Sequence, residues 1–179
     1  MIYTCTLDTP LGAMTAAAKE DALIGLWFVG QKYYPSGTAD WIREPARPVF
    51  GTVRRYLEKY FAGKDSALDL QLEPQGSVFQ KTVWDFLLKI PMGQVATYGQ
   101  IAGYVARSLD LASMSAQAVG GAVGHNPISI LIPCHRVVGS NGKLTGYAGG
   151  LDRKAALLQI ERVTPEEVDS KLFVPPLTV

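Results

Sequence analysis

The chain has 179 residues, of which 47% are hydrophobic and 18% are charged, and its formal net charge is +1. This length suits a compact enzyme with one large domain or two small ones. No apolar run suggests a membrane span, and the N-terminus lacks the charged and then hydrophobic segments of a secretory signal. We therefore expect a cytoplasmic protein without a membrane partner.

The first thirty residues contain three short strand-like runs in which apolar and polar side chains alternate. The runs cover residues 1–8, 11–18 and 22–30, and turn residues separate them at 9–12 and 19–21. This pattern predicts an antiparallel meander of three strands.

A helix is predicted next, because apolar residues recur at helical spacing up to Phe61 and Gly63 then ends the pattern. We expect this helix, residues 49–61, to cover the sheet. Residues 65–76 alternate again and end in a proline and a glycine, which indicates a domain boundary. The predicted divisions of the chain are a first domain of residues 1–75, a second domain of residues 76–165 and a tail of residues 166–179.

The second domain is predicted to be built from helices. A dense apolar set favours a buried helix over residues 78–90, with Ser77 as its N-cap. Two short helices follow, from Thr97 to Val105 and from Ser115 to Gly124, and together they suggest a helix-turn-helix. The last of them is rich in glycine and alanine, so its backbone could approach DNA closely without reading many base edges. Ordinary close packing of helices is the alternative explanation.

Charge is distributed unevenly between these regions. Residues 1–75 hold eight Lys/Arg against nine Asp/Glu, whereas residues 76–165 hold eight against four, and the tail from residue 166 holds one against three. A modest positive excess on the second domain suits weakly sequence-selective contact with phosphates.

A cysteine and a histidine are neighbours in Ile130-Leu131-Ile132-Pro133-Cys134-His135-Arg136-Val137-Val138, where proline stops an apolar run. A free thiol has a pKa of roughly 8.5 and becomes a useful nucleophile near neutral pH when a base or a positive field stabilises its thiolate. His135 could be that base if a tight turn at Pro133 or a bridging water lets the two neighbours act together. The alternative, for such a pair alone, is a buried structural cysteine beside a surface histidine.

The remaining thiol, Cys5, lies in a very different context, and the chain has only two histidines. No cluster of ligands is spaced for a metal, so we expect two reduced thiols and neither a metal nor another cofactor.

The surroundings of Cys134 favour the reactive interpretation. Gly124-His125-Asn126-Pro127 precedes the run, Thr145-Gly146-Tyr147-Ala148-Gly149-Gly150-Leu151 follows it, and Glu161 lies beyond on a predicted helix. From the region of Phe79 to Glu161, the chain closely resembles the O6-alkylguanine-DNA alkyltransferases, also called methylated-DNA–protein-cysteine methyltransferases, in their bacterial form.

The resemblance implies an α+β fold. Its first domain would be ribonuclease H-like, with a three-stranded antiparallel sheet and a covering helix. Its second would be an all-helical, winged-helix-like domain that carries the helix-turn-helix and the active-site cysteine. The implied partner is double-stranded DNA containing O6-alkylguanine, bound through its minor groove by a monomer.

The resemblance also implies an activity and a catalytic set. The protein would flip the damaged guanine out of the duplex and move its alkyl group irreversibly to its own cysteine. Cys134 would be the nucleophile, His135 the base acting through water, and Glu161 the carboxylate that orients the imidazole. Asn126 would tie the recognition helix to the active-site turn, and Tyr98 would press on the target phosphate and help to protonate the leaving guanine.

Further residues are implied at the DNA and in the guanine pocket. The expected DNA contacts are Gln117, Ala116, Gly120, Gly121, Arg107 and Arg136. The expected pocket residues are Val137, Tyr147, Ala148 and Gly149. Gln117 stands where the family usually has an arginine that fills the vacated stack, and Arg107, on a turn about five residues longer than usual, is the other candidate for that role.

Two other functions compete with this one. Some relatives bind alkylated DNA without repairing it, but they replace the cysteine with a bulkier residue. A Cys-His hydrolase would need an oxyanion hole and turnover, and the sequence identifies no such hole.

Overall fold

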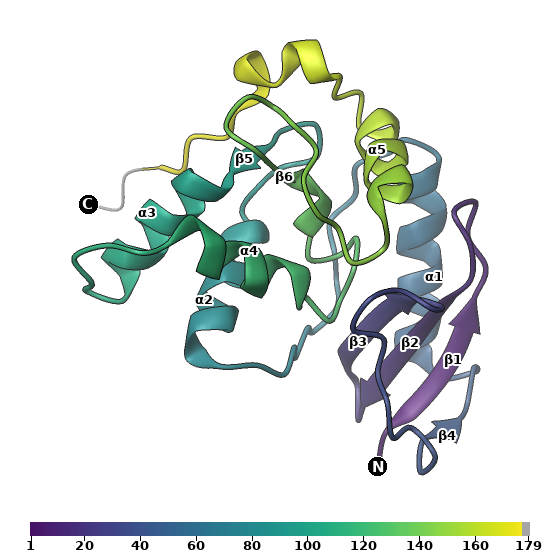
Figure 1. Ribbon diagram of the computed structural model, residues 1–179. Coiled ribbons are helices and arrows are strands. Elements are labelled where there is room, and N and C mark those ends of the chain that lie inside the picture. The colour runs from purple at the N-terminus through teal and green to yellow at the C-terminus, as the bar shows by residue number, and fades with distance from the viewer. Residues whose placement is uncertain (177–179) are drawn as a thin grey trace. The chain divides into compact units, whose positions relative to one another are not determined.

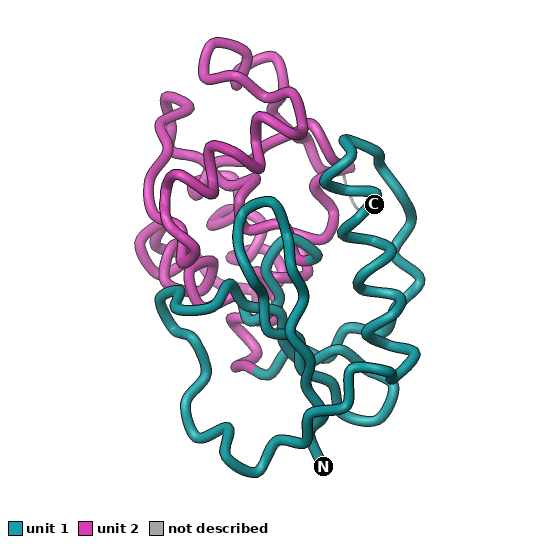
Figure 2. The backbone as a smooth tube through the Cα atoms, turned by 90° about the vertical axis from the view of Figure 1, so that its right-hand side faces the viewer, with its two compact units in different colours: residues 1–75, 127–131 teal, residues 76–126, 132–179 magenta. Residues whose placement is uncertain are grey.

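The structure is a computed structural model that describes residues 1–176. The chain forms two compact units (Figure 2). Unit 1 contains residues 1–75 and Pro127–Leu131, and unit 2 contains Gly76–Asn126 and the described chain from Ile132 onward. Among the helices of the described residues, none is long and apolar enough to cross a membrane.

Unit 1 is built on a sheet with the strand order β3-β2-β1-β4 (Figure 1). Strands β1 (Tyr3–Leu7), β2 (Met14–Lys19) and β3 (Ala22–Phe28) pair antiparallel, which confirms the predicted meander. The expectation of only three strands is wrong, because β4 (Ile42–Arg43) pairs parallel with β1. A strand of two residues is too short to produce an alternating pattern in the sequence.

One long helix, α1 (Pro48–Phe61), covers the sheet of unit 1. Pro48 occupies the first turn, where a missing N–H has no intrahelical partner to lose. The helix buries five residues, Val49, Phe50, Val53, Leu57 and Tyr60. The predicted apolar stripe is therefore present, except that Tyr60 is buried in place of Phe61.

The segment Pro127–Leu131 belongs to unit 1, although it follows the predicted boundary by about fifty residues. Leu26 donates its N–H to the carbonyl of Pro127 at 2.8 Å, and Ser129 donates to the carbonyl of Leu26 at 2.9 Å. This segment therefore joins β3 through an isolated parallel bridge between Leu26 and Ile128. The predicted boundary at residue 75 is the place where the chain first passes from unit 1 to unit 2. The later return of Pro127–Leu131 to unit 1 was not predicted.

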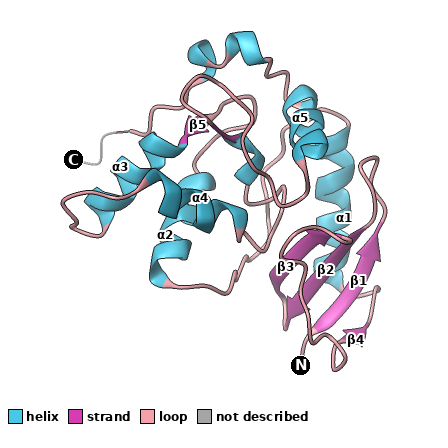
Figure 3. Cartoon of the chain, viewed as in Figure 1, coloured by secondary structure: helices cyan, strands magenta, loops and turns pink. Residues whose placement is uncertain are grey.

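Unit 2 contains four α-helices (Figure 3), which are α2 (Val78–Leu87), α3 (Tyr98–Ser108), α4 (Ala116–Gly124) and α5 (Leu151–Ile160). Capping boxes begin α2 at Ser77 and α3 at Thr97, so the side-chain signals for these starts were correct. Trp84 is 1% exposed and donates its indole N–H to the carbonyl of Ala122 at 2.9 Å. It is therefore a core residue.

The expectation of an all-helical second domain is wrong in one detail that matters for the site. Strands β5 (Ala96–Thr97) and β6 (Val137–Val138) pair in parallel, immediately before α3 and immediately after the cysteine segment. This pair fixes Tyr98 and Cys134 relative to each other within unit 2.

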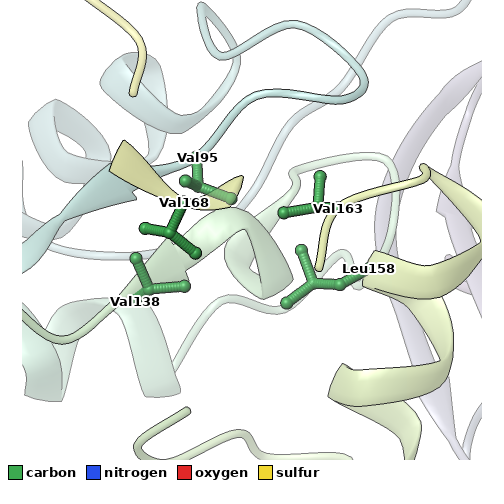
Figure 4. Packing of buried hydrophobic residues seen from close by; sticks show 5 residues of the cluster. All are labelled: Val95, Val138, Leu158, Val163 and Val168. Atoms are coloured by element: carbon green, nitrogen blue, oxygen red, sulfur yellow. The ribbon is translucent and has the colours of Figure 1, made fainter. Parts of the chain in front are cut away.

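The predicted tail is part of unit 2. Val168 joins Val95, Val138, Leu158 and Val163 in a buried apolar cluster (Figure 4). Phe173 donates its N–H to the carbonyl of Val95 at 2.8 Å. Two short 3₁₀ helices, η2 (Pro165–Glu167) and η3 (Asp169–Lys171), connect these contacts. The C-terminal segment thus supports the strand pair next to the site.

Candidate active site

Cys134 lies at the start of a 3₁₀ turn, η1 (Cys134–Arg136). Before it, Pro133 has φ −82° and ψ 65°, and the N–H of Cys134 donates to the carbonyl of Ile132 at 2.8 Å. These values describe an inverse γ-turn, a shape for which proline presets the φ angle. The tight turn expected at Pro133 is present, and it removes Cys134 and His135 from strand geometry.

A strained residue precedes this turn. Ile130 has a φ of +70°, an unusual value for a β-branched side chain, and it is 1% exposed. Such conformations cost roughly 1–3 kcal/mol and persist where surrounding packing enforces them. Burial therefore holds the segment that leads to Cys134 in a shape that its local preferences do not favour.

Asn126 connects the end of α4 to the cysteine turn. Its amide Nδ2 donates to the carbonyl of Ile132 at 2.7 Å, and its side chain is 3% exposed. The same side chain forms a hydrogen bond with Cys134 that lowers the pKa of the thiol. The side chain of Asn126 thus binds the residues on both sides of Pro133.

His135 and Glu161 form a buried pair. The imidazole Nε2 lies 2.5 Å from Oε1 of Glu161, at the C-terminal end of α5, and the two residues are 0% and 4% exposed. Because an ionised carboxylate only accepts hydrogen bonds, Nε2 carries a proton and donates it to Glu161. Nδ1 is then the nitrogen that can take up a proton.

Arg136 occupies a position that corrects our expectation. We expected a DNA contact, but its side chain is buried and binds Glu161 in two places, with Nε 2.9 Å from Oε2 and Nη2 3.0 Å from Oε1. Its Nη1 donates to the carbonyl of Ile90 at 2.6 Å. The backbone N–H of Gly93 donates to Glu161 Oε2 at 3.2 Å. Arg136 therefore binds and orients Glu161. Nothing in the sequence distinguishes an arginine in such a buried position from an arginine on the surface.

Burial and charge shift the pKa values of these groups in different directions. Burial raises the pKa of Cys134, against the hydrogen bond from Asn126, the charge of Lys154 and two backbone N–H groups. Burial lowers the pKa of His135, although Glu161 acts against that shift. Burial alone would raise the pKa of Glu161, but His135 and Arg136 hold it well below its usual range. The site therefore contains a neutral imidazole beside an ionised carboxylate near neutral pH.

The loop between β6 and α5 contacts two further residues. Tyr98, the first residue of α3, donates its hydroxyl to the carbonyl of Thr145 at 2.8 Å, and burial raises the pKa of that hydroxyl. Lys154 on α5 donates to the same carbonyl at 3.3 Å and to that of Gly146 at 3.1 Å. Sequence reasoning missed Lys154, because a single lysine in a helix gives no signal that it is buried.

The expected pocket residues are placed along the same part of the chain. Val137 and Gly149 are buried, and Tyr147 and Ala148 are half-buried. Val137 also donates its N–H to the carbonyl of Cys134 at the end of η1. The pocket residues therefore flank Cys134 on both sides in sequence, and none of them lies fully exposed.

The predicted DNA contacts on α4 form a face of small side chains. Ala116, Gln117 and Gly121 are exposed, whereas Gly120 is half-buried. A Cβ atom on Gly120 would lie 3.7 Å from the ring of Tyr98, an ordinary van der Waals distance, so this ring lies beside α4 at Gly120. Ser115 caps the helix through the N–H groups of residues 117 and 118, which confirms where α4 begins.

Arg107 lies at the end of α3, exposed, and its Nη1 is 3.5 Å from the Cβ position of Gly103 on the same helix. In this structure the guanidinium extends back along its own helix. The longer turn between α3 and α4 contains Asp110 with φ +53°. The structure therefore presents both Gln117 and Arg107 to solvent.

Among residues 1–176, no group of three or more His, Cys, Asp or Glu side chains is placed so that it could hold a metal ion.

Fold and site together define an α+β protein with a buried cysteine that is followed directly in the chain by a buried His-Glu pair. Two family models match the chain, the 6-O-methylguanine DNA methyltransferase ribonuclease-like domain over residues 1–74 and the DNA binding domain of the same family over residues 78–163. The chain belongs to the 6-O-methylguanine DNA methyltransferase family.

Individual relatives agree with this assignment. A methylated-DNA–protein-cysteine methyltransferase from Mycolicibacterium paratuberculosis is 47% identical over 162 residues, which cover 90% of this chain and 93% of the relative. One from Methanosarcina barkeri is 43% identical and covers 89% of this chain and 97% of its own length. A crystal structure of Mycobacterium tuberculosis OGT in complex with DNA matches with a TM-score of 0.79, at 40% identity, and covers 89% of this chain and 92% of that one.

Proposed function

We propose that this protein repairs DNA by moving the alkyl group of an O6-alkylguanine irreversibly onto Cys134, once per molecule. The observation that carries the proposal is the buried Cys134 on a 3₁₀ turn, followed directly by a histidine that is paired with Glu161. Family membership supports it, because the relatives are named for methyl transfer from DNA to a protein cysteine. The class of enzyme is a methylated-DNA–[protein]-cysteine S-methyltransferase.

The chemical step uses His135 as a base. The thiol of Cys134 gives its proton through water to Nδ1 of His135, and the Glu161 carboxylate stabilises the imidazolium that forms. The thiolate then attacks the alkyl carbon, so that an S–C bond forms while the C–O6 bond breaks. The electron pair of the broken bond goes to the guanine, and Tyr98 supplies a proton to the base. The proton held by His135 then restores the Tyr98 hydroxyl through water, so that both side chains return to their neutral forms. In sum, the thiol proton ends on guanine and the alkyl group ends on sulfur.

The lowered pKa of His135 fits this step. An imidazole that is neutral near pH 7 can accept a proton, whereas one that already carries a proton cannot. Glu161 remains ionised because His135, Arg136 and the N–H of Gly93 all donate to it. The pair is therefore prepared for a proton transfer that leaves a cation beside an anion.

Tyr98 must change partners during the reaction. Its hydroxyl donates to the carbonyl of Thr145 in this structure. To reach the guanine or its phosphate it would leave that carbonyl, which Lys154 continues to bind. The half-buried Tyr147 and Ala148 would close over the base with Gly149, and the backbone carbonyls of Cys134 and Val137 would accept from the guanine amino group. Ala148 has only its backbone amide to offer to O6.

The guanine has to leave the base stack first, at a cost of roughly a few kcal/mol. The exposed small residues of α4 (Ala116, Gly121 and the half-buried Gly120) would lie in the minor groove, where their backbone can approach closely. Either Gln117 or Arg107 would fill the vacated space. We further propose that the protein acts as a monomer in the cytoplasm, since its chemistry needs DNA and a reduced thiol.

A count of transferred groups tests the proposal against its alternatives. The protein is incubated with duplex DNA that contains O6-methylguanine, and the methyl groups removed per protein molecule are counted. One methyl group per molecule is expected. A count of zero would indicate a protein that only recognises damage, and a count above one would indicate a catalyst that turns over.

A further inference from the structure

Lys154 carries a charge for which the catalytic scheme above has no use. Its side chain, in the middle of α5, is 0% exposed and is among the largest fully buried side chains of the described residues. A buried ammonium is unfavourable unless other groups compensate its charge and bind its protons. Its hydrogen bonds go to two neutral carbonyls, those of Thr145 and Gly146. No ion pair is formed between Lys154 and a carboxylate within the described residues.

Helix α5, which carries Lys154, packs against η1, which carries Cys134. The charge of Lys154 lowers the pKa of the Cys134 thiol, and the charge of Cys134 raises the pKa of Lys154 in return. Burial acts in the opposite direction and sets the pKa of Lys154 at about 8. Tyr98, which binds the same carbonyl as Lys154, also interacts electrostatically with Cys134. Polar groups from three elements, α3, η1 and α5, thus interact with one another within unit 2.

Before the thiol gives up its proton, His135 supplies no positive charge. Its ring is bound to Glu161, its pKa is lowered, and the charge of Glu161 is matched by that of Arg136. The histidine, glutamate and arginine together therefore carry no net charge when the imidazole is neutral. Of the side chains that lower the pKa of Cys134, Asn126 acts by a hydrogen bond and Lys154 by its charge.

We propose that Lys154 is the positioning cation of the active site, whose ammonium group stabilises Cys134 as a thiolate and holds the carbonyls of Thr145 and Gly146 beside it. This inference rests on the proposed function, since it concerns the thiolate that attacks the alkyl group. His135 takes up the proton and Lys154 stabilises the anion that remains. The two tasks are separate, so they can be tested separately.

The test measures how readily Cys134 ionises, with iodoacetamide as the probe because it needs neither DNA nor a guanine pocket. The rate of labelling at Cys134, read from its peptide by mass spectrometry, is followed against pH for the parent and for Lys154→Met, Lys154→Arg and Lys143→Met. Lys143 is the matched control, because it is an exposed lysine in the loop that precedes α5.

We expect Lys154→Met to raise the apparent pKa of Cys134 by at least one unit, which makes labelling at pH 7 about tenfold slower. Lys154→Arg should recover most of the rate, and Lys143→Met should behave as the parent. A parental titration of Cys134 in folded Lys154→Met would overturn the proposal. A variant that lost only the guanine pocket would still be labelled by iodoacetamide at the parental rate. The measurement therefore distinguishes an effect of the Lys154 charge on Cys134 from an effect of Lys154 on the position of the loop.

A second measurement needs no variant, and so it decides the matter even if Lys154→Met fails to fold. The pKa of Lys154 is followed by ¹³C NMR at its Cε, before and after iodoacetamide has alkylated Cys134 in the parent. Because electrostatic coupling is reciprocal, loss of the thiolate should lower the pKa of Lys154. An unchanged Lys154 titration would contradict the proposal.

Transfer from free O6-benzylguanine is measured in the same samples. A parent that takes no benzyl group yet shows both Lys154 effects would overturn the proposed function and leave the assignment of Lys154 in place.

Discussion

The two cysteines of the chain are both buried, but the groups that surround their thiols differ. Cys5 in β1 is 2% exposed and Cys134 is 4% exposed, and burial raises the pKa of both thiols. Cys5 lies opposite Ala16 in a regular strand pair, and only the charges of Arg54 and Arg43 act against the shift. Cys134 has hydrogen-bond donors directed at it, from Asn126 and from two backbone N–H groups. We infer that burial disfavours the thiolate at both positions and that the donors directed at Cys134 act against this effect there.

The two units also differ in the polar side chains that they bury. The buried polar residues of unit 1 are neutral, namely Gln31 and Ser129, which lie 3.5 Å apart between Oε1 and Oγ. All buried charged residues within the described chain belong to unit 2, and they are Arg136, Lys154 and Glu161, with the titratable His135 among them. Buried charges are costly and are retained where chemistry needs them. The following experiments test whether the buried charges of unit 2 affect stability and alkyl transfer more than exposed residues do.

The largest effect should come from breaking the Arg136–Glu161 pair. Arg136→Met leaves the Glu161 carboxylate buried without its bidentate partner, and such a change costs about 3–5 kcal/mol in the free energy of unfolding. Arg107→Met removes an arginine that is exposed, and we expect a change within about 0.5 kcal/mol. Urea unfolding of both variants provides the measurement. Equal stability of the two would show that Arg136 does not support Glu161.

Glu161→Gln should slow alkyl transfer about a hundredfold or more, because the neutral amide no longer stabilises the imidazolium that His135 forms. DNA affinity should remain close to that of the parent, since Glu161 is buried. Single-turnover rates at saturating DNA are compared with dissociation constants for the same folded proteins. Parental rates would remove Glu161 from the mechanism.

The stability of the parent should decline on acidification because of Glu161. Its pKa in the folded chain lies far below the ordinary 4.5, so below pH 4.5 the unfolded chain binds a proton that the folded chain does not. The stabilisation is therefore complete above that pH and is lost as the pH falls toward the folded value. Urea midpoints between pH 7 and pH 3 should fall more steeply for the parent than for Glu161→Gln. Parallel curves would indicate that the carboxylate is not stabilised by its neighbours.

The smallest expected effect concerns the surface residues that would fill the vacated base stack. If Gln117 has this role, Gln117→Ala should reduce transfer from duplex DNA roughly tenfold and leave transfer from free O6-benzylguanine unchanged, because only the duplex requires flipping. Gln117→Arg should then accelerate duplex repair. If Arg107 has the role, Arg107→Ala should show the selective defect and Gln117→Arg should be neutral or harmful. If both alanine variants show parental rates on both substrates, neither residue fills the vacated stack, and the base-flipping mechanism implied by the family resemblance would be excluded.

Much of the local structure could be predicted from short-range signals. Ser77, Thr97 and Ser115 mark helix starts because their side chains bind N–H groups two or three residues later, which is a property of the local sequence. The turn at Pro133 follows from the φ angle that proline imposes. The placement of Cys134, His135 and Glu161 was predicted from a family resemblance, and the structure pairs the last two.

Long-range partners could not be predicted in the same way. Arg136 and Lys154 have no neighbour in sequence that marks them as buried, because the groups that bind Arg136, Glu161 and Ile90, are 25 and 46 residues away. The two-residue strands β4, β5 and β6 are stabilised by pairing with distant segments and have no periodicity of their own. The chain segment Pro127–Leu131 returns to the sheet of unit 1 for the same reason. Tertiary contacts decided these features, and a single sequence does not display them.

The most direct test of the central claim, that directed donors make one of two buried thiols the acceptor, is a peptide-level mass spectrum. The protein is incubated with an excess of duplex DNA that contains O6-methylguanine and is then digested. The account predicts a single added methyl group, located on Cys134, with Cys5 unmodified, and no added mass on the folded Cys134→Ala variant. A methyl group on Cys5, or a folded parent that gains no mass while the DNA keeps its methyl group, would contradict it.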